Sequence, residues 1–185
     1  MLSCEGVIEM NKHKGFTLIE LLIVIVVMGI LASMMMLSSS ESVSTARASN
    51  IITNLRNFSM AAMALYTDSM DTFGKNPGTL KDDSDRLTEL VKSRMHNQGD
   101  IPDVGKYKVV NNEEDSTNKL YTWWAGYDLD SENSRVREKL EGRAESAKLK
   151  GSTNNTPPDK SSAVAYNHSK SKHTYVWIQI RSNRR

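Results

Sequence analysis

The sequence predicts an α+β fold in which a long N-terminal helix packs on a small antiparallel sheet with extra short helices. An apolar run over residues 16–37 passes into an amphipathic helical repeat that ends near residue 66. Further along the chain, short segments of alternating polar and apolar residues are separated by turn-forming residues, as in strands. The 185 residues have room for one such domain and an anchor, but not for two ordinary domains.

Composition excludes several classes of function. The formal net charge is only +2, so we expect no nucleic acid among the partners. The single cysteine is Cys4, so the rest of the chain has no means of forming an internal disulfide. Glycine-rich phosphate loops, nucleophile elbows and HExxH motifs are all missing from the sequence. We therefore expect a protein that is not an enzyme and that has no cofactor and no metal site.

The apolar run over residues 16–37 is long enough to cross a bilayer as a helix. Its only charged side chain is Glu20, one turn from its start. The run is too long for a secretory signal peptide, and no Ala-x-Ala-like site follows it. Lys12 and Lys14 precede the run, whereas residues 38–44 contain no base, so the positive-inside rule keeps the N-terminus cytoplasmic and exports the rest.

The motif GFTLIE at residues 15–20, with the basic segment over residues 10–14 before it, resembles the processing site of type IV pilins and of type II secretion pseudopilins. The close resemblance covers residues 10–40. It implies that a prepilin peptidase cuts between Gly15 and Phe16 and methylates the new amine of Phe16. A residue without Cβ also lets a protease approach the backbone closely, which is a physical reason for glycine at position 15. Residues 1–15 are then a leader, and we interpret residues 1–9 as a misassigned start before Met10.

The resemblance also implies a partner for Glu20. In such subunits the carboxylate is thought to meet the N-terminal amine of a neighbouring copy during assembly. The attraction between two opposite charges is stronger in an apolar medium than in water, so the pair would fix the stacking of helices. The alternative is that Glu20 lies near the lipid headgroups and reaches water.

The expected organisation is therefore pilin-like. Residues 1–15 form the leader, residues 16–37 a transmembrane and filament-core helix, and residues 38–185 an exported globular head that includes the amphipathic half of the long helix. The implied function is a structural subunit of a type IV pilus-like filament or a type II secretion pseudopilus. The alternative is a membrane-anchored minor pilin whose tip binds a protein, DNA or a surface ligand. The lack of a cysteine pair slightly favours a pseudopilin over a pilin, and the choice between these two stays open.

The implied partners are copies of the chain and other pilin-like subunits, a prepilin peptidase, an inner-membrane assembly platform and the lipid bilayer. The implied location is the bacterial cytoplasmic membrane, crossed once, with an exported C-terminal head, followed by a periplasmic or extracellular filament. Glu20 is the assembly residue, and Gly15 and Phe16 are the processing residues.

The long helix is expected over residues 17–66, because no proline precedes Pro77, whereas many pilins carry a kinking proline near the end of the apolar segment. Its second half has one apolar stripe and a separate polar face. The stripe is Ile51, Leu55, Phe58, Ala62 and Leu65; the polar face is Arg47, Asn50, Asn54 and Asn57.

The head begins with a turn at residues 74–78 and a helix over residues 82–98, stopped by Gly99. That helix has an acidic start at Asp82, Asp83 and Asp85 and an apolar face of Leu87, Leu90, Val91 and Met95. Strands are expected at residues 106–110 and 119–127, around a turn at 111–118. Aromatic residues occur on both faces of the second strand, so we expect one face to pack on the long helix and the Trp on the other face to be half-exposed or covered by the C-terminal loop.

Asp128, Asp130 and Glu132 have the spacing of a calcium loop, but Asn133 and Lys139 occupy the positions where an EF-hand needs Gly and Glu. A looser calcium site stays open. We instead expect Asp130 to cap a helix that has Glu132 in its first turn and ends at Gly151. The apolar stripe of that helix would be Val136, Leu140, Ala144 and Ala147.

The C-terminal part is expected to hold a surface loop at residues 151–162 and a closing hairpin of residues 163–167 and 173–181. Val176, Ile178 and Ile180 would lie on one face of its second arm. His168 and His173 would flank the turn as exposed loop residues.

Overall fold

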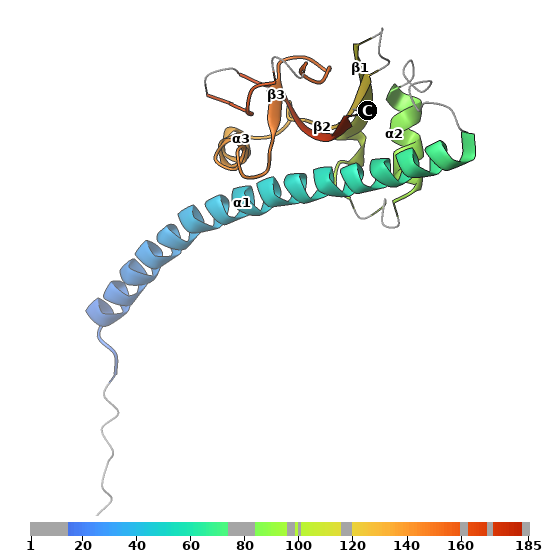
Figure 1. The fold of residues 1–185 in the computed structure, drawn as a ribbon. Helices are drawn as coiled ribbons and strands as arrows, with labels where there is room; N and C mark the ends of the chain where they lie inside the picture. The colour runs from blue at the N-terminus through green and yellow to red at the C-terminus, as the bar shows by residue number, and fades with distance from the viewer. Residues whose placement is uncertain are drawn as a thin grey trace, which may run out of the picture. The chain divides into compact units, whose positions relative to one another are not determined.

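The structure is a computed structural model that describes residues 15–73, 84–95, 99, 101–115, 120–159, 163–169 and 172–182. The chain divides into two compact units, one ending at Ser40 and the other beginning at Glu41, and each is described by itself. The predicted turn at residues 74–78, the leader before Gly15, and Asp82 and Asp83 lie outside the described residues. The layout is α+β, with a long N-terminal helix, a small antiparallel sheet and short helices, as the sequence predicts (Figure 1).

The first helix, α1, runs from Leu18 to Phe73 without a break. This confirms the predicted helix over residues 17–66 and extends it by seven residues. The glycine within it, Gly29, does not interrupt the helix, and the Ser33 hydroxyl donates to the Gly29 carbonyl oxygen at 2.8 Å. The absence of proline from this stretch means that no backbone N–H donor is missing from the interior of the helix.

The sheet of the head has four antiparallel strands in the order β1-β2-β4-β3. These are β1 (Tyr107–Asp115), β2 (Leu120–Asp128), β3 (Lys150–Ser152) and β4 (Tyr175–Ser182). The predicted first strand, residues 106–110, is therefore too short, because β1 continues to Asp115 and the turn before β2 is correspondingly smaller. β1 and β3 lie at opposite edges of the sheet (Figure 1).

The apolar stripe of α1 packs on one face of this sheet. Phe58 stacks on Tyr107 of β1 with ring centroids 5.0 Å apart, and Tyr66 meets Trp123 of β2 edge-on at 5.7 Å. All five predicted stripe residues are buried, and so are Ala48, Ile52 and Tyr66. Val176 of β4 is buried in the same core, and Ile178 and Ile180 pack against it, which confirms that these three share a face.

The opposite face of the sheet is also covered. Trp124 is 1% exposed, so the expectation of a half-exposed Trp is wrong; the alternative, that the C-terminal loop covers it, stays a prediction. Trp177 of β4 is fully buried, and its indole lies over Gly126 of β2 so closely that a Cβ there would be 2.3 Å from a ring carbon. The Trp177 indole N–H donates to the Ser152 hydroxyl at 2.9 Å, which ties the end of β3 to this face.

The second helix, α2 (Ser84–Ser93), is shorter than the predicted helix over residues 82–98. Met95 lies beyond its end and packs against the core, while Leu90 is 36% exposed. The buried residues of the helix are instead Leu87, Thr88, Val91 and Lys92. Thr88 has a special role, because its hydroxyl accepts from the Val109 N–H at 2.9 Å and so caps the outer edge of β1. A strand edge blocked in this way cannot pair with another chain at that point.

The third helix, α3 (Ser134–Glu141), also differs from the prediction. Its N-cap is Asn133, whose side chain accepts from the Val136 N–H at 2.8 Å, and not Asp130; Glu132 precedes the helix. The helix ends at Glu141, before the expected Gly151. Ala144 and Ala147 are buried in the turns that follow, and Gly151 belongs to β3, so the surface loop begins after Ser152.

The predicted closing hairpin is wrong in its first arm. Ala165 makes only an isolated bridge with Lys150, and the strand neighbours of β4 are β2 and β3. His173 is buried and not exposed: its Nδ1 accepts from the Asn167 N–H at 3.1 Å, and burial lowers its pKa. Gly151 lies so close to the His173 ring that any Cβ would clash with it.

Candidate functional site

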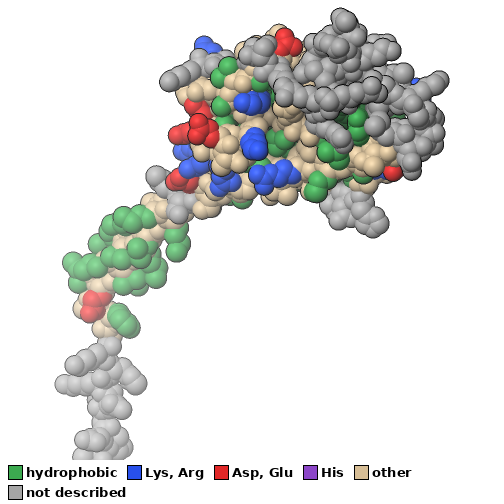
Figure 2. All heavy atoms as spheres, viewed as in Figure 1, with side chains coloured by type: hydrophobic (Ala, Val, Ile, Leu, Met, Phe, Trp, Pro, Cys, Tyr) green, Lys and Arg blue, Asp and Glu red, His purple; other side chains and the backbone are tan. Residues whose placement is uncertain are grey.

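The first part of α1 presents only exposed side chains. Every described side chain from residue 16 to residue 36 is exposed, although nearly all are apolar; the exposed fraction of the large apolar ones ranges from 46% at Val24 to 92% at Phe16. Within the described residues, α1 is the one helix long and apolar enough to cross a membrane. Figure 2 shows hydrophobic side chains over the visible face of this part of the helix. An apolar surface of this extent needs a lipid or protein environment.

Glu20 caps the N-terminus of its own helix. Its Oε2 accepts from the Thr17 N–H at 2.8 Å and from the Thr17 hydroxyl at 2.9 Å, and the Glu20 N–H donates to the Thr17 hydroxyl oxygen at 3.3 Å. Such a reciprocal arrangement of residues at the N-cap and third helical positions is a capping box. The contacts use Oε2, and within the described part of the chain Oε1 has no hydrogen-bond partner.

This capping role was missed at the level of sequence, although the Thr-x-x-Glu spacing of Thr17 and Glu20 could have revealed it. It is compatible with a second role, because the unused oxygen can accept from an incoming cation while the other holds the helix end.

Gly15 and Phe16 lie just outside α1, and both are exposed. A Cβ at Gly15 would meet nothing within 4 Å, so nothing in the described chain requires glycine there. The requirement for a small residue would therefore have to come from an outside partner that approaches the backbone.

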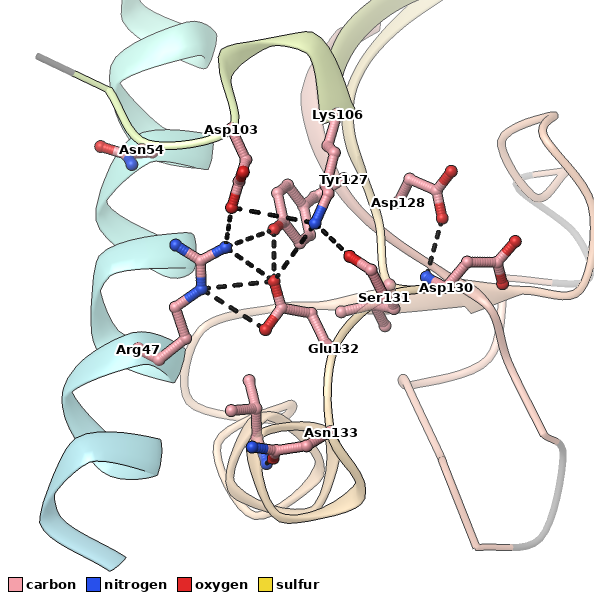
Figure 3. Close-up of polar contacts among 12 residues, drawn as sticks. Arg47, Asn54, Asp103, Lys106, Tyr127, Asp128, Asp130, Ser131, Glu132 and Asn133 are labelled. Carbon is pink, nitrogen blue, oxygen red and sulfur yellow. Dashed lines mark hydrogen bonds and ion pairs between the residues drawn. The ribbon is translucent and has the colours of Figure 1, made fainter. Parts of the chain in front are cut away.

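A second polar cluster joins α1 to the head at Arg47 (Figure 3). Arg47 Nη2 donates to Glu132 Oε1 at 2.7 Å and to the Tyr127 hydroxyl at 3.0 Å, and it also pairs with Asp103. The Tyr127 hydroxyl in turn donates to Glu132 Oε1 at 2.6 Å. Lys106 Nζ lies 3.8 Å from both carboxylates. We call these five residues the Arg47 cluster.

The electrostatics of the Arg47 cluster favour its charged form. Burial alone would raise the pKa of Glu132, but hydrogen bonds from Arg47 and Tyr127 outweigh it and hold the pKa below its usual range. The hydrogen bond from Arg47 likewise lowers the pKa of Asp103, and the pKa of Arg47 is raised by its bond to Glu132. Burial raises the pKa of the neighbouring Tyr107 to about 12 and also raises that of Tyr127, so both tyrosines in this region stay neutral.

The predicted calcium spacing does not assemble into a calcium site. The Glu132 side chain points toward Arg47 and away from Asp128 and Asp130 (Figure 3). Asp128 Oδ1 accepts from the Asp130 N–H at 2.9 Å, as in an ordinary turn. Among the described residues, no three His, Cys, Asp or Glu side chains gather closely enough to hold a metal ion.

Arg47 belongs to the helix face that contacts the sheet and its loops, although the sequence pattern placed it on a separate polar face. It lies four residues before Ile51, in register with the buried stripe, and this spacing was the available signal. Asn54 was also assigned to the polar face, yet its side chain donates to the Tyr107 hydroxyl at 3.2 Å.

Comparison with known proteins locates a family signature in the same N-terminal stretch. The family model described as the prokaryotic N-terminal methylation motif matches residues 10–36. Neither the curated proteins nor the solved structures contain a match. The matched residues include Gly15, Phe16 and Glu20 and end before the head begins. The chain therefore carries the prepilin-type N-terminal signature shared by type IV pilins and pseudopilins.

Proposed function

We propose that this chain is a structural subunit of a type IV pilus-like filament or a type II secretion pseudopilus. In this account it is processed between Gly15 and Phe16 and assembled through packing of its N-terminal helices. The observation that carries the proposal is the apolar, exposed first part of α1, which coincides with the matched methylation motif and contains a single carboxylate.

The processing step fits the local structure. The Gly15–Phe16 bond lies outside the helix, on an exposed stretch that a prepilin peptidase can reach. Hydrolysis removes residues 1–15 and creates an amine on Phe16, which the same enzyme would methylate. The new positive charge is then one residue from Thr17, which Glu20 already holds.

Glu20 of one subunit would bind the Phe16 amine of the next. Its Oε2 is engaged with Thr17, and its Oε1 offers an acceptor for that amine. Among packed apolar helices there is no water to solvate an unpaired carboxylate, so the pair would set the register of neighbouring helices. The competing role, a carboxylate that merely reaches the headgroup region, needs no neighbouring copy.

The chain would cross the cytoplasmic membrane once, with its head exported, before it enters a periplasmic or extracellular filament. Its partners would be other pilin-like subunits, the prepilin peptidase and an inner-membrane assembly platform. We expect assembly, and not catalysis, to be its activity.

Replacing Gly15 with valine tests the processing step. We expect the precursor to accumulate in the membrane, because a branched side chain blocks approach of the peptidase to the backbone. Immunoblotting should show one band that is larger than the mature protein by the leader. The matched control is Gly105→Ala, at an exposed glycine of the head with open space around it, which should be processed normally. A Gly15→Val chain that yields the wild-type mature band would refute the proposed cleavage site.

A further inference from the structure

One edge of the sheet is left open beside a groove. β4 pairs with β2 from Tyr175 to Ser182, with a register shift at Ile180. On its other side it pairs with β3 only as far as Trp177, because β3 has three residues. From Ile178 onward, this edge has no strand partner among the described residues. A groove of about 810 Å³ runs here, lined by Ile178, Gln179 and Ile180 on one side and by residues 144–150 on the other.

The groove is positively charged. Arg56 of α1, Lys148 and Lys150 line it, against the single acid Glu145. Arg56 and Lys148 are exposed, and Lys150 is half-buried with its Nζ donating to the Ala163 carbonyl oxygen at 3.3 Å. Figure 2 shows several Lys and Arg side chains on the viewed face of the head, with Asp and Glu side chains among them.

These two features together define the ligand chemistry. An open strand edge presents alternating N–H and C=O groups, which another extended polypeptide satisfies by adding a strand. The cations select a polypeptide that carries carboxylates. A nucleic acid would satisfy the charge but would leave the strand edge unpaired, so we favour an acidic polypeptide.

The chain itself contains such a segment, at the other edge of its sheet. β1 ends in Glu113, Glu114 and Asp115, and the pairing with β2 shifts register between Glu113 and Asp115. Earlier on β1, Thr88 caps the outer edge at Val109, which blocks strand addition there. The acidic end of β1 lies beyond that cap and at the sheet edge opposite the β3 side (Figure 1).

We propose that the groove beside β4 receives the acidic end of β1, residues 113–115, from a neighbouring copy of the chain. The inference rests on the proposed function, which brings copies together in a filament. Because the two surfaces differ, the contact is heterologous: each subunit offers β1 to one neighbour and β4 to another. Repetition of such a contact gives a ring or an open series of subunits, and not a two-fold dimer; in a filament the series is open.

Cysteine cross-linking tests this contact in the assembled full-length protein. Removal of the leader removes Cys4, so introduced cysteines are the only thiols in the mature chain. The variant carries Gln179→Cys and Glu114→Cys and is oxidised in cells that assemble the filament. We expect a ladder of dimers, trimers and higher multiples. The matched control pairs Gln179→Cys with Glu138→Cys, an exposed acid on α3, and should give no ladder.

Charge reversal then tests the basis of recognition. In the variant that carries Gln179→Cys and Glu114→Cys, we add Arg56→Glu and Lys148→Glu. The amount of cross-linked multimers should fall about tenfold, which corresponds to ~1.4 kcal/mol. Adding Glu113→Lys and Asp115→Lys should restore it, and such restoration shows that the reversed chain still folds. Dimers from Gln179→Cys alone would indicate a two-fold β4–β4 contact and overturn the proposal.

The failures of the two proposals are distinguishable. If mature, Glu20-dependent filaments form without a ladder, the groove contact is wrong and the proposed function stands. If the wild-type chain is neither processed nor assembled, the proposed function fails and the groove contact falls with it. If filaments give no ladder but retain a fluorescent oligonucleotide, and Arg56→Glu with Lys148→Glu abolishes that retention, the groove is a nucleic-acid site and the copy-to-copy contact is refuted.

Discussion

Replacing Glu20 with alanine is expected to leave processing intact and to reduce filament formation at least about tenfold. The cleavage site at Gly15 is unchanged, so the mature protein should accumulate in the membrane. In the filament, however, the Phe16 amine of each subunit would have no carboxylate to neutralise it among packed apolar helices. Filaments sheared from cells and quantified by immunoblotting against total mature protein measure the effect.

Two further variants separate the roles of Glu20. Glu20→Gln keeps an oxygen that can accept from the Thr17 N–H, so it preserves the helix cap while removing the charge. Thr17→Val removes the hydroxyl from the capping box but keeps the charge on Glu20. If charge pairing drives assembly, Glu20→Gln should fail like Glu20→Ala and Thr17→Val should assemble. An alanine variant that polymerises like the wild type would show that Glu20 has no role in register.

Replacing Arg47 with leucine is expected to destabilise the head by about 2–3 kcal/mol, less than for a fully buried pair because Arg47 is 24% exposed. The change removes the main partner of Glu132, whose side chain is only 8% exposed. Urea unfolding of the full chain in detergent, followed by tryptophan fluorescence, measures the loss. All three tryptophans are buried in the head and therefore report on its unfolding.

The matched control is Arg56→Leu, an exposed arginine on the same helix, which should change stability little. Adding Glu132→Gln to Arg47→Leu should recover part of the loss, because the uncompensated charge is then gone. A loss as large for Arg56→Leu as for Arg47→Leu would show that the Arg47 cluster has no special importance.

The same cluster predicts how stability depends on pH. The folded-state pKa values of Glu132 and Asp103 are lowered, so their contribution is fully present above the ordinary carboxyl pKa of about 4 and is lost as the pH falls through the lowered values. The wild type should therefore lose stability on acidification through this range. In Arg47→Leu that loss should shrink, since burial then raises the pKa of Glu132. Equal acid sensitivity in both chains would contradict the assignment.

The features predicted well from sequence are those set by local periodicity. The apolar run and the stripe at Ile51, Leu55 and Phe58 repeat at helical spacing, and the core face of the long helix follows from them directly. The second strand was predicted almost to its ends for the same reason, because Trp123 and its alternate neighbours have the period of a strand.

The errors occur where distant segments meet. Arg47 and Glu132 are separated by 85 positions, so no local pattern links them. Glu132 binds Arg47 and lies before α3, not in its first turn, and the N-cap of α3 is Asn133. Similarly, β4 pairs with β2 across about fifty residues and with β3, and not with residues 163–167, the predicted first arm of the hairpin. The close packing of Trp177 over Gly126, which accompanies the pairing with β2, is a contact between distant segments that no local pattern shows.

The intact mass of the protein extracted from membranes tests the central claim most directly. The account predicts a chain that begins at Phe16 and carries one additional methyl group on its amine. A chain that keeps residues 10–15, with an unmodified start, would contradict it and would leave a plain single-pass anchor in place of a filament subunit.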